Sequence, residues 1–268
     1  MQSLGGNTEP SKKFLGKKIK RLYPDYQLAI VTIFCVEQCG YLGGGREVTI
    51  KQFLLNVPML NMLLRTGLVD GAHWYVAFLI IIYLGIALIK NSRIYKFKYI
   101  GIVNNLIIFI VGISLRMIGK AEALSIANYL DYYILFMIGL QLIRCIDSKH
   151  TKMHIIEISI VLLYFGMNKN IYDFICIIIT ILIVYLAYFS KLNFLDNLSV
   201  ITYIGDNSYL IYLLHQNIGF ILINGMLSSG FRNLPAILII TLSSVIVVSS
   251  VINKIKNRVF KFWREIWT

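Results

Sequence analysis

Long apolar runs separated by short charged segments dominate the chain. Five of these runs contain no Asp, Glu, Lys or Arg, and they cover residues 71–89, 99–115, 174–190, 207–231 and 233–253. Three others contain a single acid each, namely 26–45 with Glu37, 123–143 with Asp131 and 153–168 with Glu157. A helix needs about 20 apolar residues to cross roughly 30 Å of hydrocarbon. The pattern therefore predicts an all-α polytopic bundle of about eight transmembrane helices.

The positions of the basic residues set the predicted orientation. Cytoplasmic loops of membrane proteins retain Lys and Arg. With the N-terminus inside, eight spans place 19 basic residues in inner segments and 7 in outer ones. We therefore expect both termini in the cytoplasm, with a basic segment at 1–25, a membrane domain at 26–253 and a basic tail at 254–268. The apolar run 52–64 has only 13 residues and contains Pro58, which predicts a helix that lies at the interface or re-enters.

The overall composition excludes several classes of protein. Hydrophobic residues make up 57% of the chain and charged residues 15%, and the mean hydropathy is +0.71. A soluble enzyme or a disordered chain would be less apolar, and the strands of a transmembrane β-barrel would alternate apolar and polar residues. Basic flanks of membrane helices explain the net charge of +13, so we expect membrane lipid and no nucleic acid as a partner. The four histidines and four cysteines form no pattern of metal ligands, and we expect no metal.

A polar stripe is the most informative feature inside a predicted helix. The segment 205–219 reads GDNSYLIYLLHQNIG. On a helix, its Ser, second Tyr, His and last Gly recur at steps of 4, 3 and 4 and share one face; they are Ser208, Tyr212, His215 and Gly219. Polar side chains in a membrane helix face protein or water. The stripe is therefore either a set of hydrogen bonds to neighbouring helices or part of a polar cavity.

The stripe belongs to one of three segments that resemble a known family. The pattern G-x-x-S-Y-x-x-Y-L-x-H at 205–215 resembles the penultimate-helix signature of the membrane-bound acyltransferase family 3. The segment 14–26, FLGKKIKRLYPDY, resembles the basic cytoplasmic loop that leads into the third helix of that family. The N-x-x-M at 56–59 and V-D-G-A-H-W at 69–74 are similar to the stretch before its next helix. The three segments occur in the family's order, from residue 14 to about 220.

The resemblance implies a reaction in the bacterial inner membrane. Family members transfer an acyl group, usually acetyl, from acyl-CoA to a hydroxyl of a cell-surface polysaccharide or related glycan. Such a transfer needs a base of near-neutral pKa to accept the hydroxyl proton, donors for the oxyanion that develops, and cations for the phosphates of coenzyme A. We therefore expect acyl-CoA as the donor and a sugar or polysaccharide as the acceptor.

Three groups of residues match these needs. The predicted catalytic residues are His215, Tyr212 and Ser208, although the resemblance implies a supporting role for His215 and leaves proton abstraction to a histidine of another helix. The predicted acyl-CoA phosphate ligands are Lys17, Lys18, Lys20 and Arg21, which would otherwise serve only to set the topology. The predicted contacts of the acceptor sugar are Asp70, His73 and Trp74. The position of His73 at the outer end of a helix favours an interfacial anchor over a sugar contact.

The chain also departs from the family pattern. The family has ten spans and an Arg-x10-His motif in the first of them, whose His is the expected base, and this motif is absent here. Many members carry a Glu five residues after the Trp of the second motif, where this chain has Leu79. The absence of the motif suggests a chain that lacks its first two helices. Such a chain would result from a late start codon, a decayed gene or an enzyme split into two halves. It would be inactive, or it would work with a separate N-terminal half or as a homo-oligomer.

A second hypothesis is a flippase or exporter of a polysaccharide or lipid-linked intermediate. It would be favoured if the three intramembrane acids faced one cavity; these are Glu37, Asp131 and Glu157. Taken one at a time, Asp131 is expected to hydrogen-bond to neighbouring side chains. Glu157 is expected to reach the inner membrane interface, because it lies a few residues from the start of its predicted span.

Overall fold

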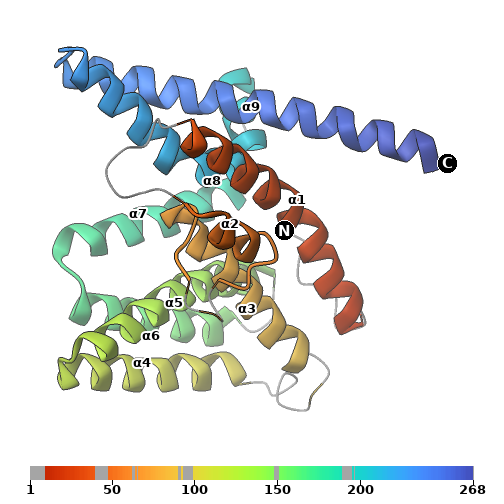
Figure 1. The fold of residues 1–268 in the computed structure, drawn as a ribbon. Helices are drawn as coiled ribbons and strands as arrows, with labels where there is room; N and C mark the ends of the chain where they lie inside the picture. Colours follow the sequence, from red (N-terminus) through yellow and green to blue (C-terminus); the bar gives the residue numbers. More distant parts are fainter. Residues whose placement is uncertain are drawn as a thin grey trace. The chain divides into compact units, whose positions relative to one another are not determined.

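The structure is a computed structural model that describes residues 10–39, 48–61, 64, 66–89, 92, 99–147, 151–188, 195 and 197–267. Within these residues the chain folds into α-helices and short 3-10 segments, and no strand occurs among them (Figure 1). The helices are α1 (Ser11–Gln38), α2 (Ile50–Asn56), η1 (Gly71–His73), α3 (Trp74–Ile89), α4 (Ile100–Ile118), α5 (Ala121–Asp147), α6 (Thr151–Asn168), α7 (Ile171–Tyr188), α8 (Ser199–Ser228) and α9 (Leu234–Trp267). The predicted all-α class is confirmed.

Each of the eight predicted spans overlaps one long helix, and the short run predicted at the interface overlaps α2. Four segments of the described chain are long and apolar enough to cross a membrane: Gly71–Ile89, Ile100–Ile118, Ser199–Ser228 and Leu234–Arg258. The apolar part of α7 is shorter. The chain is therefore a helical membrane protein, and the crossing of the membrane by the other four long helices stays a prediction.

Two helices run through the predicted domain boundaries. Helix α1 begins at Ser11, so the basic segment that was expected to precede the first span belongs to the same helix. Helix α9 likewise continues through the basic tail as far as Trp267. Residues 1–9 and 268 lie outside the described chain. The orientation of both ends toward the cytoplasm stays a prediction.

The chain forms two compact units. The first, unit 1, comprises Met1–Ala87 and Leu198–Thr268, and the second, unit 2, comprises Leu88–Asn197. Unit 1 thus contains α1, α2, η1, nearly all of α3, α8 and α9, while unit 2 contains α4 to α7. Unit 1 carries all three family-like segments, because these lie in the first and last parts of the sequence.

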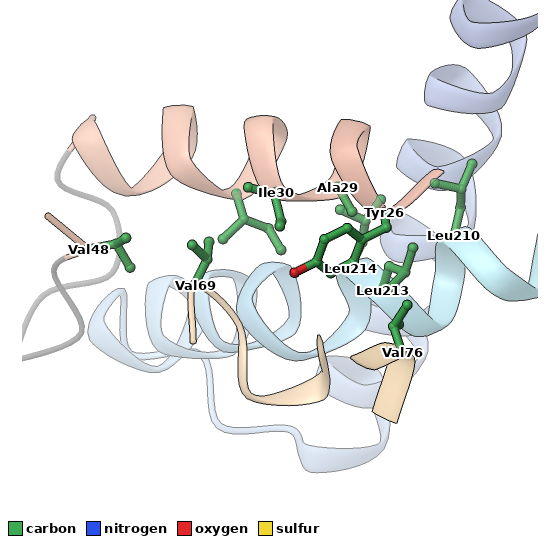
Figure 2. Packing of buried hydrophobic residues seen from close by; sticks show 10 residues of the cluster. Tyr26, Ala29, Ile30, Val48, Val69, Val76, Leu210, Leu213 and Leu214 are labelled. Carbon is green, nitrogen blue, oxygen red and sulfur yellow. The ribbon is translucent and has the colours of Figure 1, made fainter. Parts of the chain in front are cut away.

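The core of unit 1 forms where α1 and the segment around η1 pack on α8, which also lies along α9 (Figure 1). Figure 2 shows Tyr26 and Ile30 of α1 directed toward Leu213 and Leu214 of α8, with Val69 beside them. Tyr26 and Ile30 recur at helical spacing on one side of α1, and Leu213 and Leu214 do so with Leu210 on one side of α8. The remaining members of this core are Ala29, Ile33, Val48, Val76 and Leu210.

Unit 2 is held by the mutual packing of α4, α5 and α6, with α7 against α5 and α6. Its core combines aliphatic side chains with two aromatic rings of α6, Tyr164 and Phe165. A Cβ at Gly112 of α4 would lie 2.5 Å from the Tyr164 hydroxyl oxygen and 2.8 Å from the nearest ring carbon. The absence of a side chain at Gly112 therefore allows α4 and α6 to approach closely.

The replacement Gly112→Ala is expected to destabilise unit 2 by about 1–3 kcal/mol, the usual penalty for an overpacked core. The matched control is Gly139→Ala in α5, where no atom lies within 4 Å of the added Cβ. This control is expected to be neutral or stabilising by up to about 1 kcal/mol, because alanine is the better helix former. Thermal unfolding in detergent measures both. Equal midpoints for the two variants would contradict the close approach of α4 and α6.

Candidate functional site

The segment 69–73 and one turn of α8 are joined by hydrogen bonds. The Tyr212 hydroxyl donates to the carbonyl oxygen of Ala72 at 2.6 Å. The Asp70 carboxylate accepts from the backbone N–H of Ala72 at 2.7 Å and from that of Asn217 at 3.3 Å. The His73 Nε2 lies 3.1 Å from the carbonyl oxygen of Leu213. Because a carbonyl can only accept, this Nε2 carries a proton.

The Glu37 carboxylate of α1 also bonds to this turn of α8. The Asn217 side chain donates to Glu37 Oε1 at 3.0 Å and to the carbonyl oxygen of Val69 at 3.2 Å. We refer to Glu37, Asp70, His73 and Asn217 as the buried polar cluster. Their exposed fractions are 7%, 1%, 0% and 5% in that order. Within the described part of the chain, two of their atoms have no hydrogen-bond partner, Glu37 Oε2 and His73 Nδ1.

The N-x-x-M segment supports the loop that carries this cluster. The Asn56 amide donates to the carbonyl oxygens of Gln52 and Gly67, at 2.8 and 2.9 Å. Its backbone carbonyl accepts from the Tyr26 hydroxyl at 3.0 Å. Asn56 is completely buried, which makes these bonds strong relative to water-exposed ones. The short segment after α1 is thereby tied both to α1 and to the chain leading into η1.

Two of the predicted catalytic residues, Ser208 and His215, lie on the side of α8 away from the unit 1 core, whereas the Tyr212 ring packs against this core. The helix is continuous through this region, so Ser208, Tyr212 and His215 share one face as expected. Ser208 and His215 are exposed and Tyr212 is half-buried, whereas the opposite face of α8 packs in the unit 1 core. The His215 Nδ1 lies 2.6 Å from the Tyr212 carbonyl oxygen. Nδ1 therefore carries the proton of the neutral ring, and Nε2 is its basic nitrogen.

The predicted phosphate ligands divide into three environments. Lys20 and Arg21 line a pocket of about 550 Å³, and Lys17 is exposed. Lys18 is buried, with its ammonium 5.5 Å and 5.3 Å from the ring centroids of Phe14 and Tyr83. This arrangement is a cation–π contact. Only two of the four predicted ligands therefore line the pocket.

The sequence analysis missed two charged residues of this pocket. Lys256 of α9 and Asp25 of α1 both line it, and they form an ion pair at 2.5 Å. Lys256 lies in the basic tail, where the sequence offers no signal that separates it from the neighbouring cations. We refer to the pocket lined by Lys20, Arg21, Asp25 and Lys256 as the basic pocket. Its cations outnumber its acids, which suits a ligand with several negative charges.

The predicted sugar contacts are placed differently from one another. Trp74 begins α3 and is half-buried, with its ring centroid 5.7 Å from that of Tyr75. Asp70 and His73 belong to the buried polar cluster. The expectation that His73 anchors the chain at the membrane interface is wrong, because its side chain is completely buried in unit 1. Sequence reasoning also overlooked Glu37 and Asn217 as partners, since their pairing depends on the packing of α1 against α8.

The acids of unit 2 belong to separate networks. Asp131 pairs with Arg116 at 2.8 Å and with Lys169 at 2.7 Å, and it accepts from the Tyr164 hydroxyl at 2.8 Å. The expectation that Asp131 bonds to neighbouring side chains is confirmed. Glu157 is 2% exposed and pairs with His154 at 2.8 Å, so the expectation that it reaches the interface is wrong.

These two networks do not form one cavity. The Asp131 network meets α4 at Arg116, whereas the Glu157 backbone carbonyl accepts from Asn105 at 3.0 Å. Eleven residues separate these positions of α4, which corresponds to about 16 Å along a helix. The condition that would favour an exporter, three acids facing one cavity, is therefore not met by Asp131 and Glu157.

Of three comparisons with known proteins, one identifies the family of the chain. Neither the curated proteins nor the solved structures gave a match. The family model of the acyltransferase domain, acyltransferase family 3, matches residues 4–253. That match covers most of the chain and includes the basic pocket residues of α1, the buried polar cluster and the polar stripe of α8. The protein therefore belongs to acyltransferase family 3, a family of membrane acyltransferases.

Proposed function

We propose that the protein is an O-acyltransferase that moves an acetyl group from acetyl-CoA to a sugar hydroxyl of a cell-surface polysaccharide. In this proposal it works in the inner membrane of a bacterium. The basic pocket holds the phosphates of the donor, His215 is the general base, and Trp74 contacts the acceptor sugar. Family membership supports acyl transfer in general, and the further details are our proposal.

The observation that carries the proposal is the presence of the basic pocket and His215 in one compact unit. The Tyr209 hydroxyl of α8 donates to the carbonyl oxygen of Leu22 in α1 at 3.3 Å. Leu22 lies between Arg21 and Tyr23, which both line the basic pocket. His215 follows Tyr209 by six residues, or about 9 Å along α8. That separation is measured along the helix axis alone, and His215 lies on the face of α8 turned away from α1. In this proposal the flexible pantetheine arm of coenzyme A runs from the basic pocket around α8, so that the thioester meets His215.

The proposed reaction begins with proton transfer. The sugar hydroxyl gives its proton to His215 Nε2 while its oxygen forms a bond to the carbonyl carbon of the thioester. The tetrahedral intermediate then collapses with cleavage of the carbon–sulfur bond. The leaving thiolate of coenzyme A takes the proton from the imidazolium, which restores the neutral base. No other reactant is needed, and the products are the sugar ester and free coenzyme A.

The stripe around His215 suits this chemistry. The Tyr212 carbonyl accepts from Nδ1 and would stabilise the imidazolium while Nε2 holds the transferred proton. Ser208 lies two turns away on the same face with an exposed hydroxyl, which can donate to an acceptor sugar. In the basic pocket, a phosphate group would compete with Asp25 for Lys256 and would also meet Lys20 and Arg21.

The double variant Lys20→Ala/Arg21→Ala is expected to raise KM for acetyl-CoA about tenfold or more. Each lost charge-assisted hydrogen bond contributes about 1.5–3 kcal/mol, and about 1.4 kcal/mol corresponds to a factor of ten. Its matched control is Lys12→Ala/Lys13→Ala, which removes the same charge from exposed positions of α1 outside the pocket. Initial rates with labelled acetyl-CoA in membrane vesicles measure both. An equal change of KM in the two double variants would overturn the proposed donor site.

The variant His215→Ala is expected to lower kcat by about 10²–10⁴-fold, the usual contribution of a general base. The measured quantity is transfer of labelled acetyl from acetyl-CoA to surface glycan. Ser228→Ala, at the far end of α8, is the control and keeps wild-type activity. A His215→Ala protein with undiminished transfer would exclude this residue as the base, and a wild-type protein with no transfer to any glycan would refute the proposed function.

A further inference from the structure

Side chains from another segment contact both the acceptor and the donor of one backbone hydrogen bond in α8. In an α-helix the N–H of residue 217 points to the carbonyl of residue 213. Here the Leu213 carbonyl also accepts from His73 Nε2 at 3.1 Å, and the Asn217 N–H also meets Asp70 Oδ2 at 3.3 Å. The two side chains come from the same short segment at the start of α3. His215 lies midway between the two contacts.

Two further contacts fix the same turn. The Tyr212 hydroxyl donates to the carbonyl of Ala72, and the Tyr212 carbonyl is the atom that orients the His215 ring. Gly71 lies against the side chain of Gln216, where a Cβ would approach the amide to 2.8 Å. Residues 70–73 therefore contact α8 at positions both before and after His215 in the sequence. A side chain at position 71 would therefore require the end of the Gln216 side chain to move.

The burial of these groups argues for a specific role. Placing a carboxylate and an imidazole inside an apolar membrane unit is unfavourable unless both are hydrogen-bonded. Asp70 uses both of its oxygens on backbone N–H groups, and His73 uses its only neutral-state donor on the α8 backbone. Neither side chain lines the basic pocket. One Asp70 oxygen thus caps η1, and its other oxygen and His73 Nε2 are directed at the backbone that carries His215.

We propose that Asp70 and His73 are positioning residues that fix the turn 212–217 of α8, so that His215 Nε2 meets the sugar hydroxyl and the thioester in one geometry. This inference rests on the proposed function and replaces a direct contact of Asp70 and His73 with the sugar. A displacement of about 1 Å at a reacting group can lower a rate about 10²-fold, so a backbone contact behind the base is sufficient to matter.

The test compares four variants of the whole protein. His73→Phe removes the donor and keeps a ring, whereas His73→Gln keeps an N–H at nearly the same reach. Asp70→Asn replaces one accepting oxygen by an amide nitrogen that cannot accept. Asn253→Ala is the matched control, because it removes another hydrogen bond of α8, that from Asn253 to Asn207 at 3.0 Å.

The expected result is a separation of kcat from KM. His73→Phe and Asp70→Asn lower kcat about 10–100-fold and leave KM for acetyl-CoA unchanged, since the basic pocket is intact. His73→Gln restores most of kcat, and Asn253→Ala keeps it. If His73→Phe retained the kcat of Asn253→Ala, or if His73→Gln were as slow as His73→Phe, the positioning role would be refuted.

A second measurement does not depend on acyl transfer. Diethyl pyrocarbonate modifies histidine nitrogens, and the rate of its reaction with His215 reports how accessible Nε2 is. Peptide mass spectrometry measures this rate. His73→Phe and Asp70→Asn are expected to change this rate severalfold, while Asn253→Ala and His73→Gln leave it as in the wild type. If this contrast occurs in a protein without transferase activity, the proposed function fails and the positioning contact stands. If transfer occurs but neither kcat nor the modification rate responds, the positioning contact fails and the proposed function stands.

Discussion

The hydrogen bonds between the segment 69–73 and α8 are the interaction on which the arrangement of unit 1 depends. In an apolar environment a polar group without a partner is far more costly than in water, so Asp70, His73 and Asn217 stabilise unit 1 only when each of them reaches its hydrogen-bond partner. This requirement gives the packing of α8 a register that apolar contacts alone would not define. Leucine and isoleucine side chains can slide along a helix, whereas a carboxylate directed at one N–H cannot.

The same requirement explains why Ser208 and His215 of the polar stripe of α8 remain exposed. The unit 1 core uses the face with Leu210, Leu213 and Leu214, and the buried polar cluster uses Asn217 at its edge. Ser208 and His215, on the opposite face, are therefore not consumed by structural bonds to α1. A helix with two polar faces can be anchored by one of them and can react through the other.

Much of the fold could be predicted from the sequence, because apolar runs and charged breaks determine where membrane helices lie. The existence of the helices and the all-α class follow from these runs, but their ends do not. α1 begins at Ser11 and not near Tyr26, since a basic amphipathic segment continues a helix as readily as an apolar one. α9 extends beyond its apolar part for the same reason.

The site was less predictable, and the reasons are particular. The common face of Ser208, Tyr212 and His215 follows from helical periodicity alone. The pairing of Glu37 with Asn217 joins residues 180 positions apart, and no local pattern indicates it. His73 beside Trp74 matches an interfacial anchor in sequence, yet the backbone carbonyl of Leu213 provides it with a buried partner.

Unit 1 is built from the two ends of the chain, with unit 2 between them in the sequence. A ribosome therefore releases Glu37, Asp70 and His73 long before it releases Asn217 and Lys256. During synthesis the helices of unit 2 can find one another at once, because their partners are neighbours in the sequence. The carboxylates of α1 and of the loop before α3 can form their hydrogen bonds and ion pair only after α8 and α9 have been synthesised. The order of translation thus places the closing of unit 1, and with it the assembly of the turn that carries His215, after the assembly of unit 2.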